Sequence, residues 1–194
     1  MEHKSLKRGS AKISSAARAH HPGAPPGGGG AWGEALGRSR GGPTTKIHLA
    51  AEGHYRPLSL LITPGQRADC TRFEPVMGKI CVPRAGFGRP RRAPDGVSVD
   101  EAYSKGKIRA HLRKRGIRHV IPEKKDQKAA RLRRGSGGGR PPGFSTDRCK
   151  GRDTVERAIG KLEQFRAVAT RYDIRGRIHL GTITAVALLV WLRS

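Results

Sequence analysis

Two apolar periodicities succeed each other along the chain, and their order limits the folds open to it. Residues 44–53 alternate apolar and polar side chains as a half-buried strand does, and residues 57–65 predict a second, more buried strand after a short turn. Apolar runs at residues 97–99 and 118–123 predict two further strands, with a helical pattern between them at residues 104–116. A hairpin followed by strands alternating with helices predicts a mixed α/β sheet covered by helices.

Four further segments carry helical or loop signals. Residues 68–77 predict a short helix, and residues 153–172 have the spacing of a long amphipathic helix. Residues 180–192 are apolar but too short for a bilayer, which needs about 20 residues. We therefore predict a buried terminal helix there and no membrane span. Residues 123–146 are basic and glycine-rich, and we expect them to be mobile.

Glycine and proline dominate the start of the chain. The run APPGGGG cannot hold a helix or a strand, and few apolar residues surround it. We therefore expect residues 1–43 to be a disordered remnant or linker. Residues 44–194 are expected to form the ordered domain.

Positive charge is the strongest compositional feature. The chain has 40 lysine and arginine residues against 15 acids, a net charge of +25. Such an excess repels itself unless a polyanion neutralises it, so the expected partner is nucleic acid, bound in a salt-dependent way. The alternative is a basic surface that is merely solvated. The three cysteines lack metal-ligand spacing, and the first residues lack the apolar stretch of a signal peptide, so we expect a cytoplasmic, nucleoid-associated protein.

Carboxylates are scarce, so those at the ends of predicted elements are candidate metal ligands. Asp100 directly follows the strand at residues 97–99, and Glu156 lies one turn into the long helix. Phosphodiester chemistry on DNA uses divalent metal ions held by such groups. Two local alternatives stay open: Asp100 caps the following turn, or Glu156 pairs with Arg152 or Lys161 on its own helix.

Three stretches, residues 34–77, 99–127 and 134–173, closely resemble insertion-sequence transposases of the DDE class. The resemblance extends over residues 34–193. It implies an RNase H-like fold, similar to that of retroviral integrases. It also implies cutting of DNA at terminal inverted repeats and joining to target DNA, with Mg²⁺ or Mn²⁺ held by two aspartates and one glutamate. A homodimer or higher synaptic assembly is the implied working form.

The resemblance assigns roles to particular residues. Asp100 matches the second acid in a D-x-A-Y context, and Glu156 matches the third in a V-E-R context. Arg152 matches an arginine that would face DNA phosphate on the same side of the helix. Arg157 and Lys161, farther along that helix, are the other predicted DNA-binding residues.

The chain departs from the family pattern at several positions. The first aspartate belongs just before an S-T-x-x-R-A-H segment, but Ile13 precedes SSAARAH, and no hydrophobic strand is evident upstream. Cys149 stands for a tyrosine and Glu163 for a lysine. We therefore predict an incomplete sheet whose first strand is missing or degraded, in an amino-terminally truncated and catalytically impaired copy. The alternatives are a non-catalytic basic nucleic-acid-binding protein and a decayed product without a stable fold.

Overall fold

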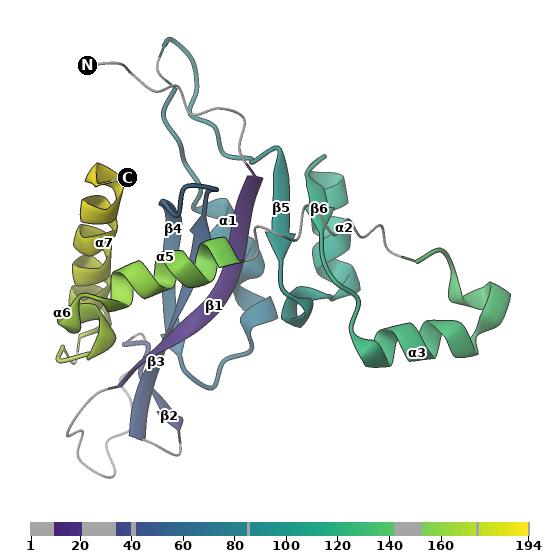
Figure 1. The fold of residues 1–194 in the computed structure, drawn as a ribbon, viewed down its shortest axis with the longest axis horizontal. Coiled ribbons are helices and arrows are strands. Elements are labelled where there is room, and N and C mark those ends of the chain that lie inside the picture. The colour runs from purple at the N-terminus through teal and green to yellow at the C-terminus, as the bar shows by residue number, and fades with distance from the viewer. Residues whose placement is uncertain are drawn as a thin grey trace.

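A mixed six-stranded sheet forms the centre of the protein (Figure 1). The computed structural model describes residues 10–20, 34–39, 42–84, 86–141, 153–173 and 175–193. The strands are β1 (Ser10–His20), β2 (Gly37–Ser39), β3 (Gly42–Ala51), β4 (Pro57–Pro64), β5 (Gly96–Val99) and β6 (Arg118–Val120). Their order is β2-β3-β1-β5-β6, with β4 also paired to β3. β1 runs antiparallel to β3 and parallel to β5, so the predicted mixed α/β architecture is confirmed.

β1 lies in the middle of the sheet, between β3 and β5. The expectations of a missing first strand and of an unstructured segment over residues 1–43 were therefore wrong for residues 10–20 and 37–39. The serine- and alanine-rich sequence of β1 carries little apolar alternation, and its neighbours on both sides supply the ladder that satisfies its backbone. Residues 1–9 and 21–33 lie outside the described residues.

The hairpin of β3 and β4 is confirmed, but the expected burial was wrong: β3 is buried on both faces, with His48 only 1% exposed, and β4 is only partly buried. Ile47 lies opposite Ile62, and Leu49 lies opposite Leu60. These four apolar side chains pack with the helices of one face of the sheet. Ala50, which directly follows Leu49, packs on the other face. Alternation along β3 therefore supplies both cores of the protein.

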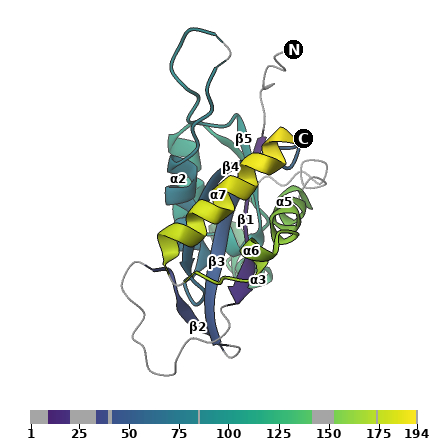
Figure 2. The same cartoon turned by 90° about the vertical axis from the view of Figure 1, so that its left-hand side faces the viewer.

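One hydrophobic core lies on each face of the sheet. Figures 1 and 2 show the helices that cover the two faces. The first lies under α1 (Phe73–Gly78) and α2 (Gly106–Lys114), and the second under α5 (Asp153–Glu163), α6 (Arg166–Ala169) and α7 (Gly176–Leu192). The first contains Ala11, Ile13, Phe73, Val99 and Leu112, and the second contains Leu49, Val155, Ile159, Leu162 and Ile183. The helix predicted at residues 68–77 is thus confirmed as α1 preceded by a 3₁₀ turn, Asp69–Arg72.

Two helical predictions need correction. The long helix expected over residues 153–172 breaks after Glu163, because Phe165 adopts an extended conformation and packs against the second core. The segment expected to be mobile contains α3 (Lys125–Arg133) and a 3₁₀ turn, Gly135–Gly138. Its lysines, arginines and alanines are good helix formers, but they show no apolar period. No helix within the described ranges is long and apolar enough to cross a membrane.

A buried arginine in the segment between α6 and α7 ties that segment to the residues just before β2. The Arg171 guanidinium, 0% exposed, donates hydrogen bonds to the backbone oxygens of Glu34 and Ala35 and to the Thr45 hydroxyl. The Glu34 carboxylate accepts the backbone N–H of Gly176 at the start of α7, and this bond lowers the pKa of Glu34. A carboxylate at a helix start also interacts favourably with the positive end of the helix dipole.

Candidate functional site

Asp100 lies at the carboxyl end of β5, beside the central strand. Val99, which precedes it, is level with Ile13 of β1 in the parallel ladder. Asp100 is half-buried, and its Oδ1 accepts the backbone N–H of Glu101 at 2.7 Å. This bond starts the 3₁₀ helix Glu101–Tyr103, so the predicted turn cap is confirmed. The cap uses one of the two carboxylate oxygens.

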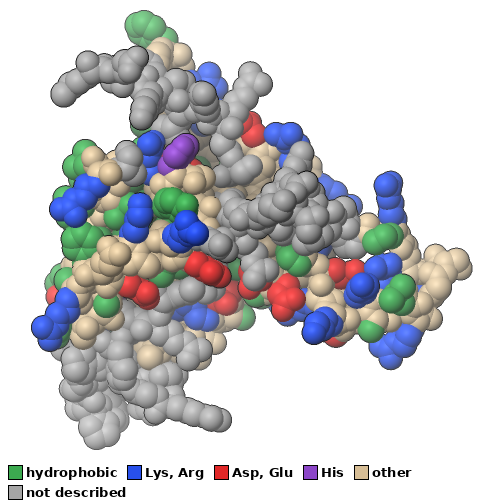
Figure 3. Space-filling view, viewed as in Figure 1, with side chains coloured by type: hydrophobic (Ala, Val, Ile, Leu, Met, Phe, Trp, Pro, Cys, Tyr) green, Lys and Arg blue, Asp and Glu red, His purple; other side chains and the backbone are tan. Residues whose placement is uncertain are grey.

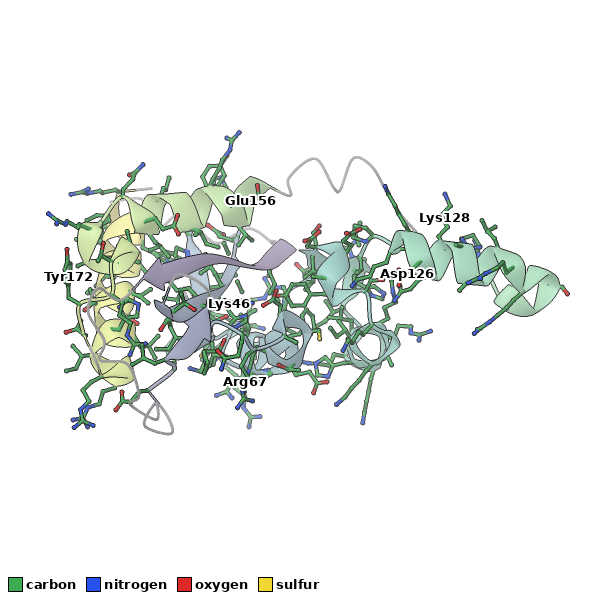
Figure 4. The ribbon with its side chains drawn as sticks, turned by 90° about the horizontal axis from the view of Figure 1, so that it is seen from below. Lys46, Arg67, Asp126, Lys128, Glu156 and Tyr172 are labelled. Carbon is green, nitrogen blue, oxygen red and sulfur yellow. The ribbon has the colours of Figure 1, made fainter. Side chains whose placement is uncertain are left out.

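Glu156 lies on the exposed side of α5, one turn from its start. Val155, Ile159 and Leu162 anchor this helix in the second core, against β1 and β3. Figure 1 shows the first turn of α5 crossing β1 on the side of β5, and Figure 4 shows Glu156 at the outer edge of the helix. Both candidate acids therefore belong to elements that contact β1. Over the described parts of the chain, Glu156 makes no ion pair, and its proposed partner Lys161 contacts an aromatic ring instead.

The position of the first family aspartate is part of the hydrophobic core. Ile13 is only 2% exposed and packs with the residues beneath α1 and α2. No group of three histidine, cysteine, aspartate or glutamate residues in the described segments is arranged to hold a metal ion. Glu52, at the end of β3, forms an ion pair with Arg56, whose Nε lies 3.3 Å from its Oε1. The described residues therefore do not fit the three-acid, two-ion site that the resemblance implies.

Arg157 and Lys161 of α5 converge on Tyr55, a residue that no sequence pattern singles out. The Arg157 Nη1 donates to the Tyr55 hydroxyl at 3.1 Å. The Arg157 guanidinium carbon and the Lys161 Nζ lie 5.7 and 5.1 Å from the centre of the Tyr55 ring. Such cation–π contacts hold two long side chains near one point. Two of the three predicted DNA-binding residues are thus brought together.

The turn between β3 and β4 positions Tyr55. The Glu52 N–H donates to the Arg56 oxygen and the Tyr55 N–H donates to the Glu52 oxygen, both at 3.0 Å. Tyr55 has a φ of 65°, a left-handed conformation that side chains with a Cβ rarely adopt. The guanidinium carbon of the next residue, Arg56, lies 5.1 Å from the centre of the Trp191 ring of α7. The turn therefore links the hairpin to α5 and to α7.

Two family positions cannot be compared in space. Arg152 and Cys149 lie outside the described residues, so the phosphate contact of Arg152 stays a prediction. Glu163, where the family has a lysine, is exposed at the end of α5.

The comparison with protein families settles the membership of the chain. The family model described as "Transposase DDE domain" matches residues 14–191. The chain belongs to the DDE transposase family. A relative in this family, the putative transposase for insertion sequence element IS402 of Burkholderia cepacia, is 31% identical over 140 residues. These residues are 72% of this chain and 59% of the relative, so the chain spans about three fifths of the length of that DDE protein.

One solved structure is a more distant match. The chain is similar to piggyBac transposase in a synaptic complex with hairpin DNA, with a TM-score of 0.47 and 9% identity. The match covers 95% of this chain and 47% of that one. At this TM-score the likeness adds nothing to the family assignment, which depends on the sequence matches.

Proposed function

We propose that the chain is the RNase H-like part of an insertion-sequence transposase that binds DNA but is impaired in cutting it. The observation that carries the impairment is the burial of Ile13 beside Val99, at the position where the family resemblance expects the first aspartate. An isoleucine offers no oxygen to a cation. Asp100 and Glu156 are then the two remaining members of the catalytic set.

The proposed loss is chemical. In intact relatives, bound Mg²⁺ or Mn²⁺ would activate the attacking oxygen and stabilise the oxygen of the leaving group. Two carboxylates supply fewer oxygen ligands than such ions need, and one of the two already caps a turn. We therefore derive no metal-dependent step for this chain. The roles left to Asp100 and Glu156 are those of metal ligands in an incomplete site.

DNA binding is supported by charge and by the arrangement of α5. The net charge of +25 needs a polyanion to offset it. Arg157 and Lys161 lie on the same helix as Glu156 and meet at the ring of Tyr55, so phosphate groups bound there would lie next to Glu156. The bound DNA would be a terminal inverted repeat or a target site. A dimer or higher synaptic assembly on the nucleoid completes the proposal.

Replacing Arg157 and Lys161 together with alanine is expected to weaken binding to duplex DNA about tenfold at low salt, because two phosphate contacts are lost. The slope of log affinity against log salt should fall by about 1.8, at ~0.9 for each phosphate. Fluorescence anisotropy over a salt series measures both quantities.

The matched control replaces two exposed arginines with alanine, Arg177 in α7 and Arg193 directly after it. It removes the same charge at another place. Equal losses in the two double variants would show that binding follows net charge alone and would contradict a site on α5.

A further inference from the structure

The segment after β6 projects from the domain as an arm. α3 stands away from the sheet in Figures 1 and 4, and none of its nine residues is buried. We name residues 123–140 the basic arm. A helix that buries nothing gains little from tertiary packing, so its position on the surface needs another explanation.

The basic arm carries a large excess of positive charge. It has seven cations and two acids in its sequence, Glu123 and Asp126. Glu123 is taken up by Arg131, whose guanidinium lies 3.0–3.1 Å from both carboxylate oxygens and lowers the pKa of Glu123. The remaining cations make no ion pair within the described part of the chain: Lys124, Lys125, Lys128, Arg133, Arg134 and Arg140. Figure 3 shows lysine and arginine side chains gathered over α3.

Hydrogen bonds fix the base of the arm near Asp100. Gln127 accepts from the Ser104 hydroxyl at 2.7 Å and donates to the Ser104 backbone oxygen at 3.0 Å. Ser104 follows the 3₁₀ helix that Asp100 caps. Arg109 of α2 also donates to the Ile121 oxygen at 2.8 Å, just before the arm. The arm is therefore preorganised relative to the candidate acid, which reduces the entropy lost on binding.

We propose that the basic arm is a second binding surface for duplex DNA, extending the contact beyond α5. This inference rests on the proposed function, that the chain binds DNA. Figure 4 shows Lys128 of the arm and Glu156 of α5 directed to the same side of the molecule. A duplex passing Glu156 on that side would continue along the arm.

The composition of the arm favours duplex DNA over other partners. Residues 123–140 contain no aromatic side chain, whereas protein interfaces and single-stranded nucleic acids both depend on aromatic anchors or stacking platforms. Cations on several sides of a projecting helix match the closely spaced phosphates of a duplex. Leu132 is the arm's one exposed large hydrophobic residue.

The test replaces Lys128, Arg133 and Arg134 with glutamine and measures affinity for a duplex of about 30 base pairs. We expect affinity at least about tenfold weaker at 0.1 M salt and a salt slope lower by about 2.7. The matched control replaces three exposed cations of α2 with glutamine: Lys107, Arg113 and Lys114. Because α2 covers the face of the sheet opposite α5, this variant should change affinity by less than about twofold.

A second readout is duplex length. The wild-type protein should lose affinity when the duplex is shortened to about 12 base pairs, and the arm variant should not, because its distant contacts are already gone. Each variant's thermal unfolding is recorded first, and Arg133→Gln alone replaces the triple variant if that one does not fold.

The outcomes separate the two proposals. Equal affinity of the arm variant and the wild type, or equal losses in the arm variant and its control, would overturn the arm alone. An equal loss of binding to single-stranded DNA or to an acidic protein would overturn its specificity for the duplex. A wild-type protein that binds no DNA would overturn the proposed function itself.

Discussion

Replacing Ile13 with aspartate is expected to destabilise the protein strongly instead of completing a metal site. Ile13 is 2% exposed and packs in the core with Phe73 and Val99. A carboxyl group there has no polar partner to offset its desolvation, so the free energy of unfolding should fall by about 4 kcal/mol or more. Such a loss is a large part of the stability of an ordinary domain, on the order of 5–15 kcal/mol. Urea denaturation followed by circular dichroism measures it.

The matched control is Ile13→Val, which removes one methylene and should cost about 0.5–1.5 kcal/mol. A further sign comes from pH. Burial raises the pKa of a carboxyl group, so the aspartate variant should lose stability as pH rises from the unfolded-state pKa through the folded-state pKa. If Ile13→Asp were as stable as the wild type at neutral pH, residue 13 would not lie in the core.

Replacing Arg171 with alanine is the second change with a large expected effect. The guanidinium is fully buried and bonds to the backbone oxygens of Glu34, Ala35 and Asp173. Its removal leaves these acceptors without their donor, and we expect the free energy of unfolding to fall by about 3–5 kcal/mol. Arg171→Lys should recover only part of that loss, because an ammonium group cannot reproduce the planar fork of donors.

The control for Arg171 is its neighbour Arg175, which forms an ion pair with Glu34 at 3.2 Å while its side chain is 63% exposed. An exposed pair of this kind is worth about 0–1 kcal/mol, so Arg175→Ala should change stability little. Thermal or urea unfolding of the two variants side by side provides the comparison. Similar losses of stability in both variants would contradict the stabilising role of the buried Arg171 hydrogen bonds.

The parts of the fold that were predictable from the sequence are those with a strong apolar period. Ile47 and Leu49 on β3, and Ile108 and Leu112 on α2, marked their elements because these buried side chains recur with the period of a strand or of a helix. β1 was missed because it is rich in serine and alanine and takes its stability from strands on both sides. α3 was missed because a helix that buries no residue has no apolar pattern to detect.

The candidate site was predictable only in part. Asp100 could be identified because it follows a buried strand, and Glu156 because it lies near the start of an amphipathic helix. Tyr55 could not, because its place depends on a turn in a left-handed conformation and on α5, about a hundred residues away in sequence. Local patterns do not encode such distant contacts.

Strand cleavage in Mg²⁺ or Mn²⁺ shows most directly whether the remaining acids suffice for catalysis. The unmodified chain and the double variant Asp100→Asn, Glu156→Gln are incubated with supercoiled plasmid and with duplex DNA, with and without each metal ion. We predict that both proteins bind DNA and that neither nicks it above the rate seen with the metal ion alone. Metal-dependent nicking by the unmodified chain that disappears in the double variant would contradict the proposed impairment.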